Sequence, residues 1–154
     1  MKLTLRVQYG CARAGLPGRA AIRAWARAAL AGMRRRRVEL TVRIAGAAEG
    51  ARLNRRYRGR RGATNVLSFP YENPPGVRTD MLGDLVICAP VVAREARAGR
   101  PPAAAHWAHM VVHGIMHLRG YDHRNRKEAA IMEAREARVL ARLGFPDPYS
   151  ASNV

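Results

Sequence analysis

Apolar and polar residues alternate in two stretches of the first third of the chain. Leu3, Leu5 and Val7 are separated by single polar residues, and the same alternation runs through residues 38–44. Such alternation is typical of a strand with one buried face, so each stretch predicts a strand. Between them, apolar residues recur at helical spacing over residues 22–33, which predicts an amphipathic helix.

The middle of the chain combines helical, turn and strand patterns. Residues 47–58 suit a short helix, and the basic stretch 59–62, with a glycine at each end, suits a turn. Residues 64–70 and 83–89 contain β-branched and apolar side chains in short runs, which favours strands. The prolines and the glycine of residues 71–81 predict a loop between those two strands.

The rest of the chain has helical patterns. Three helices are predicted over residues 90–98, 103–118 and 125–143, and the second is so apolar that we expect it to be buried. The order βαβαββααα predicts an α+β fold, with a small mixed sheet of about four strands covered by about five helices. We expect residues 1–154 to form a single domain.

Positive charge is concentrated in the first half of the chain. Lys and Arg number 28 against 11 acidic residues, which gives a net charge of +17. Residues 1–62 have a net charge of +15, whereas residues 63–154 have a net charge of +2. Such an asymmetry is typical of proteins that bind a polyanion, most often a nucleic acid, with an acidic membrane surface as the second option. Residues 1–62 are therefore predicted to be the RNA-binding half.

The apolar runs indicate neither a membrane segment nor a secretion signal. Every run falls far short of the ~20 residues that span a bilayer, and the N-terminus lacks the apolar core of a signal peptide. Cys11 and Cys88 lie far apart in the sequence, as expected for reduced thiols. The sequence therefore predicts a cytoplasmic protein without a membrane partner.

The segment HGIMHLRGYDH, residues 113–123, contains three histidines. His113 and His117 are four residues apart, which places both on one face of a helix, at the spacing that zinc enzymes use. Gly120 can end that helix and let the chain turn, so that His123 becomes the third ligand. Three histidines leave the fourth position of one Zn²⁺ ion open, which is the pattern of a catalytic site.

The residues near these histidines narrow the chemistry. His106 and His109 are expected to be structural or to support the ligands, and Asp122 to orient a ligand or to cap the next segment. Position 114 is glycine, whereas HExxH metalloproteases have their general base, a glutamate, after the first histidine. Peptide hydrolysis is therefore disfavoured, whereas attack of a zinc-bound water on a phosphodiester is still possible without this glutamate.

HGIMHLRGYDH resembles the HGxLHLxGYDH motif of the YbeY family, bacterial endoribonucleases and ribosomal-RNA maturation factors, with Met116 in place of the usual leucine. LNRRYRGRRGATNVLSFP, residues 53–70, is similar to a second block of that family. LGDLVICA, residues 82–89, and LGFPDPY, residues 143–149, also match. The resemblance covers most of residues 38–149.

The resemblance implies a small mixed sheet with helices and a zincin-like metal helix, with His113, His117 and His123 as the zinc ligands and Arg58 as a catalytic residue. It implies cleavage of single-stranded RNA, in 16S ribosomal RNA 3′-end maturation and in ribosome quality control. The implied partners are ribosomal RNA, proteins of the small ribosomal subunit and an Era-type GTPase. Four further arginines are expected to contact the RNA backbone: Arg55, Arg56, Arg60 and Arg61.

The residues leave alternatives open. The chain could instead be a non-catalytic RNA-binding ribosome assembly factor with a structural zinc. If it is a nuclease, the attacking group could be water or the 2′-hydroxyl of the RNA. Tyr57 and Tyr121 could stack on bases or pack in the core, and Arg34 to Arg37 could be a second contact or a solvated run. A serine nucleophile at Ser68 is disfavoured, because no nucleophile-elbow glycines surround it.

Overall fold

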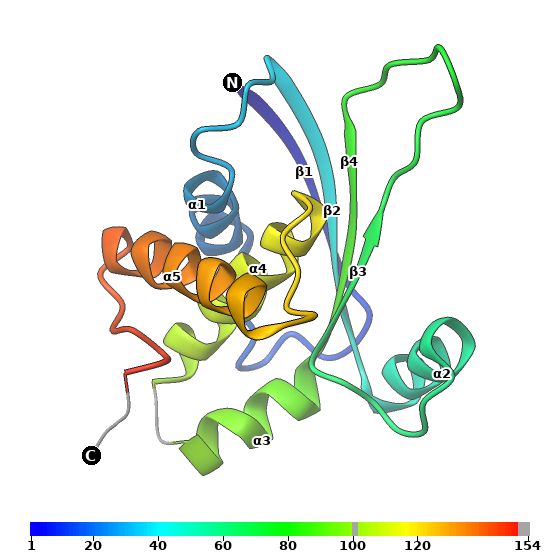
Figure 1. Ribbon diagram of the computed structural model, residues 1–154. Coiled ribbons are helices and arrows are strands. Elements are labelled where there is room, and N and C mark those ends of the chain that lie inside the picture. The colour runs from blue at the N-terminus through cyan, green and yellow to red at the C-terminus, as the bar shows by residue number, and fades with distance from the viewer. Residues whose placement is uncertain (100–101, 151–154) are drawn as a thin grey trace.

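The computed structural model describes residues 1–99 and 102–150 (Figure 1). It confirms the predicted α+β fold and the predicted order of elements. The elements are β1 (Lys2–Tyr9), α1 (Arg19–Ala29), β2 (Arg37–Ala45), α2 (Ala47–Arg58), β3 (Val66–Pro70), β4 (Met81–Cys88), α3 (Ala89–Gly99), α4 (Ala103–Leu118) and α5 (Arg126–Arg142).

The four strands form one mixed sheet in the order β1-β2-β4-β3. β1 pairs in parallel with β2, and β2 pairs in parallel with β4, so that the helices α1 and α2 are the long connections that parallel pairing requires. β3 pairs antiparallel with β4 through the loop between them. β1 and β3 are therefore the two edges of the sheet.

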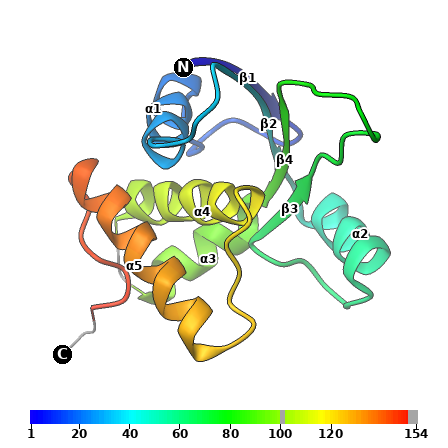
Figure 2. The ribbon, with the colours of Figure 1, turned by 45° about the horizontal axis from the view of Figure 1, so that its top comes forward.

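The helices are distributed unequally over the two faces of the sheet. α1, α4 and α5 lie on one side, and α2 lies on the other, beside β3 and β4 (Figures 1 and 2). α4 is the central helix, as its apolar sequence predicts, because it packs against α1, α3 and α5 as well as against β3 and β4. Its residues Val111, Val112, Ile115 and Met116 are all fully buried.

α1 is the element whose bounds differ most from the prediction. It ends at Ala29, whereas the spacing of apolar residues extends to Met33. Gly32 has a φ of 85°, in the left-handed region, so the chain has already left the helix there. Leu30 is buried and Met33 still packs against the core, which explains why the apolar spacing continues beyond the helix.

Candidate active site

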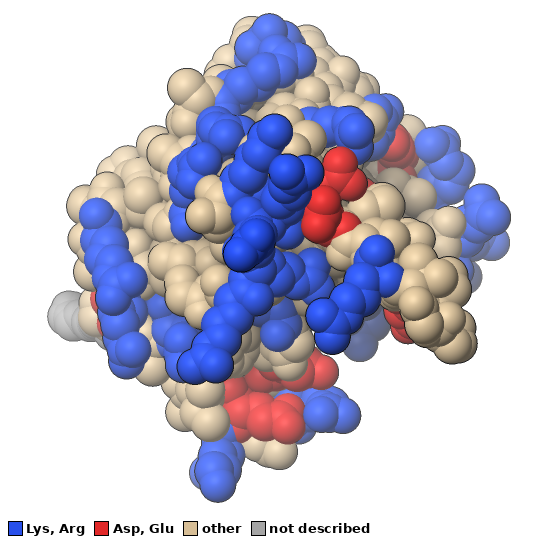
Figure 3. Space-filling model, turned by 90° about the horizontal axis from the view of Figure 1, so that it is seen from above, with Lys and Arg blue, Asp and Glu red and all other residues tan. Residues whose placement is uncertain are grey.

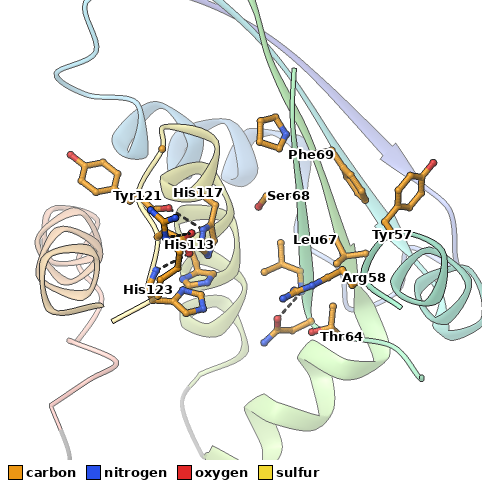
Figure 4. A pocket seen from close by; sticks show the side chains of 16 residues that line it. Tyr57, Arg58, Thr64, Leu67, Ser68, Phe69, His113, His117, Tyr121 and His123 are labelled. Carbon is orange, nitrogen blue, oxygen red and sulfur yellow. Dashed lines mark hydrogen bonds and ion pairs between the residues drawn. The ribbon is translucent and has the colours of Figure 1, made fainter. Parts of the chain in front are cut away.

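The end of α4 brings the three histidines together. Gly120 has a φ of 98°, its N–H donates to the carbonyl oxygen of His117, and the N–H of Tyr121 donates to that of Met116, each at 3.0 Å. This pair of bonds is a Schellman motif, which ends the helix and reverses the chain. His123 thereby returns beside His117, and one ligand atom of each of the three histidines lies within 4.8 Å of the others (Figure 4).

The hydrogen bonds of two of these rings leave one nitrogen of each free. The Nδ1 atom of His113 lies 2.6 Å from a carboxylate oxygen of Glu136, and the Nδ1 atom of His117 lies 3.0 Å from the carbonyl oxygen of Tyr121. Both oxygens can only accept a hydrogen bond, because one belongs to an ionised carboxylate and the other to a backbone carbonyl. Nδ1 therefore donates in both rings, and Nε2 keeps its lone pair. Such bonds are the usual support of histidines that bind a metal.

The protonation of His117 suits the same purpose. Burial is the main cause that lowers the pKa of His117 below its ordinary value, and the neighbouring rings of His113 and His123 act in the same direction. The imidazole is therefore neutral at neutral pH, which is the state in which a histidine binds a metal. Three imidazole nitrogens at this separation fit the ligand set of a zinc ion.

Glu136 of α5 is a functional candidate that the sequence interpretation missed. The residue is fully buried, and its carboxylate accepts hydrogen bonds from His113, from His109 at 3.0 Å and from the hydroxyl of Tyr149. Burial by itself would raise the pKa of Glu136, but the bonds from His109 and His113 outweigh it and lower the pKa to about 2. The carboxylate therefore stays charged inside the protein.

A sequence signal for Glu136 exists. It lies four residues after Met132 and three and four residues before Val139 and Leu140, all of which are buried. Residues at these spacings share one helical face, so Glu136 is an acidic residue in the apolar stripe of its helix. A buried carboxylate requires partners, and the histidines of α4 provide them.

The other two histidines each bond to a carboxylate, and only His109 bonds to one that also contacts a candidate ligand. His109 contacts Glu136, and Nε2 of His106 lies 2.9 Å from Glu95, which also accepts from the side chain of Asn65. The atoms of His109, His113 and Glu136 are close enough to bind a metal. Both histidines already bond to the carboxylate of Glu136, however, so we assign His109 and Glu136 to the support of His113.

Asp122 caps the segment after α4. One of its oxygens accepts from the backbone N–H of His123 at 2.8 Å, and the other lies 3.4 Å from Nε of Arg124. The bond from the backbone of His123 is the main reason why the pKa of Asp122 lies below its ordinary value. Of the two predicted roles, the structure favours the cap, which fixes the backbone beside His123 rather than its ring.

The histidines open onto a cavity of about 790 Å³, whose far wall is formed by β3 and the end of α2. Arg58, the last residue of α2, belongs to this far wall, and its side chain extends into the cavity (Figure 4). Tyr57 and Tyr121 also line the cavity. The fold thus brings Arg58 and the three histidines to one cavity, although they are far apart in the sequence.

The other four predicted arginines lie outside this cavity. Arg55, Arg56, Arg60 and Arg61 are all exposed, and they line a separate hollow of about 810 Å³ along α2 and the turn after it. Arg52, which the sequence interpretation did not single out, lines the same hollow. A strand of RNA in the histidine cavity would meet these arginines only where it continues beyond that cavity.

Gly114 packs α4 tightly against the sheet. A Cβ atom at this position would lie 2.7 Å from Cδ2 of Leu85 and 3.2 Å from Cγ2 of Val66. A glutamate there would collide with these side chains, so packing as well as sequence disfavours the general base of the HExxH metalloproteases. The hydroxyl of Ser68 donates to the carbonyl oxygen of Gly114 at 3.1 Å, which agrees with a structural role for this serine.

Two further observations concern the class of protein. No helix within residues 1–99 and 102–150 is long and apolar enough to cross a membrane. Cys11 and Cys88 are both free thiols, as the sequence predicts, and burial raises the pKa of the Cys88 thiol.

Comparisons with known proteins agree on one family. The family model described as Endoribonuclease YbeY matches residues 18–144. Endoribonuclease YbeY of Alkalilimnicola ehrlichii is 58% identical, over 96% of this chain and 91% of the relative. The proteins of the same name from Methylococcus capsulatus and Nitrosococcus oceani are 55% and 49% identical, over 87% and 98% of this chain and 87% and 99% of the relatives.

A solved structure shares the fold. The solution structure of TM1509 from Thermotoga maritima matches with a TM-score of 0.56 and 21% sequence identity, over 96% of this chain and all of that one. At this identity the likeness concerns the fold alone, and it supports the α+β arrangement described above.

Proposed function

The chain belongs to the endoribonuclease YbeY family, and from that premise we propose that it is a zinc-dependent endoribonuclease that cleaves single-stranded RNA. The observation that carries the proposal is the cavity in which the free Nε2 atoms of His113 and His117 lie beside His123, with Arg58 on the facing wall. Neither the histidines alone nor the arginine alone would favour phosphodiester chemistry over other reactions.

In this proposal His113, His117 and His123 hold one zinc ion. When bound, zinc polarises a phosphoryl oxygen and lowers the pKa of a water molecule. Glu136 and the carbonyl of Tyr121 hold two of the rings in the orientation that this requires. The group of neighbouring ligands has three members among the described residues, and His123 is exposed. Both facts support an open, catalytic site over the structural zinc of a non-catalytic assembly factor.

Arg58 is proposed to stabilise the negative charge that develops on the phosphate during cleavage. A guanidinium group is positively charged and can bind two phosphate oxygens at once. Because it stands opposite the histidines, a phosphate in the cavity lies between two sources of positive charge. The attacking group is left open: a 2′,3′-cyclic phosphate on the product would indicate the 2′-hydroxyl, and its absence would indicate water.

Single-stranded RNA suits the walls of the cavity. Tyr57 is 56% exposed, and its ring packs against Phe69 with centroids 5.1 Å apart, with the guanidinium of Arg56 5.5 Å from its centroid. A fixed, exposed aromatic ring is a platform on which an unpaired base stacks. Arg55, Arg56, Arg60 and Arg61 would then bind the backbone of the same strand beyond the cavity.

The proposal extends to the cellular role. We assign the chain to 16S ribosomal RNA 3′-end maturation and ribosome quality control in the cytoplasm, with small-subunit proteins and an Era-type GTPase as partners. The support for this role is the family membership together with the net charge of +17, which suits a protein that works on ribosomal RNA.

The test compares cleavage of a single-stranded RNA by the wild type, His113→Ala, Arg58→Ala and the control Arg97→Ala, with the zinc content of each measured. We expect His113→Ala to lose both zinc and cleavage. Arg58→Ala should keep its zinc and should cleave RNA at least about 100-fold more slowly than the wild type, because it lacks only the stabilising charge. Arg97→Ala, an exposed arginine of α3, should resemble the wild type. Equal cleavage by all four would show a contaminating nuclease and defeat the proposal.

A further inference from the structure

Three arginines of α1 form a row along the β1 edge of the sheet. Arg19, Arg23 and Arg27 are spaced four residues apart, so they lie on one helical face with about 6 Å of rise between neighbours. Their guanidinium groups donate to the carbonyl oxygens of Val7, Leu3 and Met1, at 3.4, 3.0 and 3.5 Å. We call these three residues the arginine row.

The arginine row continues into a second group of basic residues. Arg34 to Arg37 are all exposed, and the N–H of Lys2 donates to the carbonyl oxygen of Arg36, so this run lies at the start of β1, beside the end of the row at Arg27. Figure 3 shows Lys and Arg side chains gathered over the end of the molecule that holds the N-terminus, with few acidic side chains among them. The row is thus part of a broad basic surface.

The charge of this surface is not neutralised from within. Among the residues that the structure describes, the arginines in ion pairs with carboxylates are Arg43 and Arg124, and neither belongs to the surface. Each arginine of the row is fixed by a bond through one nitrogen, which leaves other donors of its guanidinium free. Covering the edge of the sheet therefore occupies only some of the hydrogen-bond donors of these arginines.

Within the described residues, this basic surface has no exposed aromatic ring on which an unpaired base could stack. The exposed aromatic side chains of the described residues are Tyr57, Tyr71 and Tyr149, and all three lie outside residues 1–45. Tyr9 is beside the row, but the guanidinium groups of Arg13 and Arg19 lie 4.2 and 5.0 Å from its ring centroid. A straight series of fixed positive charges without a stacking platform matches duplex RNA, which proteins bind through its phosphates and its shape.

We propose that the arginine row, with the adjoining run Arg34 to Arg37, is a second RNA-binding surface that holds the phosphate backbone of a double-stranded segment. β1 and β3 are opposite edges of the sheet, separated by three strand spacings of about 5 Å, so the row is remote from the cavity beside β3. The inference rests on the proposed function: the cavity takes the single strand to be cut, and the row anchors a neighbouring helix of the same RNA.

The test measures binding of a blunt RNA duplex, which a single-strand-specific nuclease leaves intact, by fluorescence anisotropy over a range of salt concentrations. The variant is Arg19→Gln with Arg27→Gln, which removes the two arginines with the longest bonds to β1 and keeps Arg23. We expect the Kd for the duplex to rise about tenfold or more, and the slope of log K against log salt to fall by about 2. The charge-matched control is Arg97→Gln with Arg138→Gln, on α3 and α5.

Equal weakening by the two double variants would overturn the proposal, because the duplex would then respond to net charge and to no particular surface. Unchanged duplex binding by the row variant would also overturn it. Arg19→Lys with Arg27→Lys keeps the charge and should bind within a few-fold of the wild type, which guards against a loss caused by misfolding. Cleavage of a short single strand should be unaffected by the row variant. A failure of the nuclease proposal would appear in that cleavage assay and would leave the duplex measurement interpretable.

Discussion

At the scale of single residues, the site depends on a charge inside the protein. Glu136 is fully buried and ionised, and it connects His113 to His109 and to Tyr149. An isolated buried carboxylate would be strongly destabilising, whereas this one is surrounded by donors. The same bonds hold the ring of His113 in one tautomer and one orientation, so the buried charge of Glu136 prepares His113 for the proposed metal site.

Glu136→Gln should therefore weaken zinc binding while the side chain keeps its size. We expect the affinity for zinc to fall about 10–100-fold, the usual effect of losing a group that orients a ligand. Competition with a chromophoric chelator measures it. Glu133→Gln, on the exposed side of the same helix, is the matched control. Zinc affinities that are the same for Glu136→Gln and for the wild type would show that the carboxylate does not prepare His113.

The effect of Gly114→Ala on stability tests how tightly α4 packs against the sheet, because packing and helix propensity predict changes of opposite sign. In an open helix, alanine stabilises by about 1 kcal/mol relative to glycine. At position 114 the added methyl group would lie 2.7 Å from Leu85, so we expect Gly114→Ala to lower the free energy of unfolding by about 1–3 kcal/mol. Urea unfolding at neutral pH measures the difference. A variant more stable than the wild type would mean that α4 has room to move away from the sheet.

The sequence predicts the members of the site better than the connections among them. The spacing of His113 and His117, with Gly120 after them, is a local pattern that leads directly to a helix end and a returning third histidine. Glu136 and Arg58 reach their positions through packing between elements distant in the sequence. Their partners depend on the tertiary structure, so no local pattern specifies which histidine or which wall they meet.

At the scale of elements, a partly buried ion pair joins β2 to the first turn of α2. Arg43 donates to both carboxylate oxygens of Glu49, at 2.6 and 3.0 Å. The hydrogen bond from Arg43 is the main reason why the pKa of Glu49 is below its ordinary value, and burial opposes it. Because the folded pKa is the lower one, the pair contributes stability above the unfolded pKa of about 4.3, and this contribution disappears as the pH falls through the folded value.

Glu49→Gln should accordingly lose less stability on acidification than the wild type does. We expect the two proteins to differ most in thermal midpoint near pH 7 and to converge as the pH falls through the folded pKa of Glu49, below which Glu49 is protonated in both states of the wild type. Thermal unfolding followed by circular dichroism at a series of pH values gives the comparison. Glu72→Gln, at an exposed loop position, should follow the wild type. If the thermal midpoints of Glu49→Gln and the wild type changed with pH in parallel, the ion pair would make no pH-dependent contribution to stability.

Element positions were largely predictable, and strand order was not. Alternation and helical spacing identify where β1, β2 and α4 lie, because each buries one face or all of its surface. The order β1-β2-β4-β3 places β4, the last strand in sequence, inside the sheet. Apolar content hints at this, since most of β4 is buried, but alternation alone does not distinguish the neighbours of a strand.

At the scale of the whole molecule, we propose that residues 1–154 fold as one domain. Among the described residues, the main apolar core contains residues of α1, the sheet, α4 and α5, and a smaller cluster on the other face packs Leu53 of α2 against the same sheet. The sheet is shared by both clusters, which supports a single domain. Trp25 of α1 and Trp107 of α4 are both buried in the main core. Tryptophan fluorescence and far-UV circular dichroism should therefore report the same urea midpoint. Two separated midpoints would divide the chain into independently folding parts.

The distribution of charge also belongs to this scale. The first 62 residues contribute nearly all the net charge, yet the three histidines proposed as zinc ligands lie in the second half of the sequence. The fold resolves this separation by carrying Arg58 to the cavity while the arginine row stays on the opposite edge of the sheet. Sequence alone shows the asymmetry, but only the arrangement of strands shows that the basic residues form more than one surface.

The central claim is that a metal held by His113, His117 and His123 is needed for RNA cleavage. The most direct measurement removes zinc with a chelator, confirms that the chain remains folded, and titrates zinc back while cleavage of a single-stranded RNA is followed. We predict that cleavage is lost with the metal and returns in full at about one zinc per chain. A folded, metal-free protein that cleaves the RNA as fast as the zinc-loaded protein would contradict it.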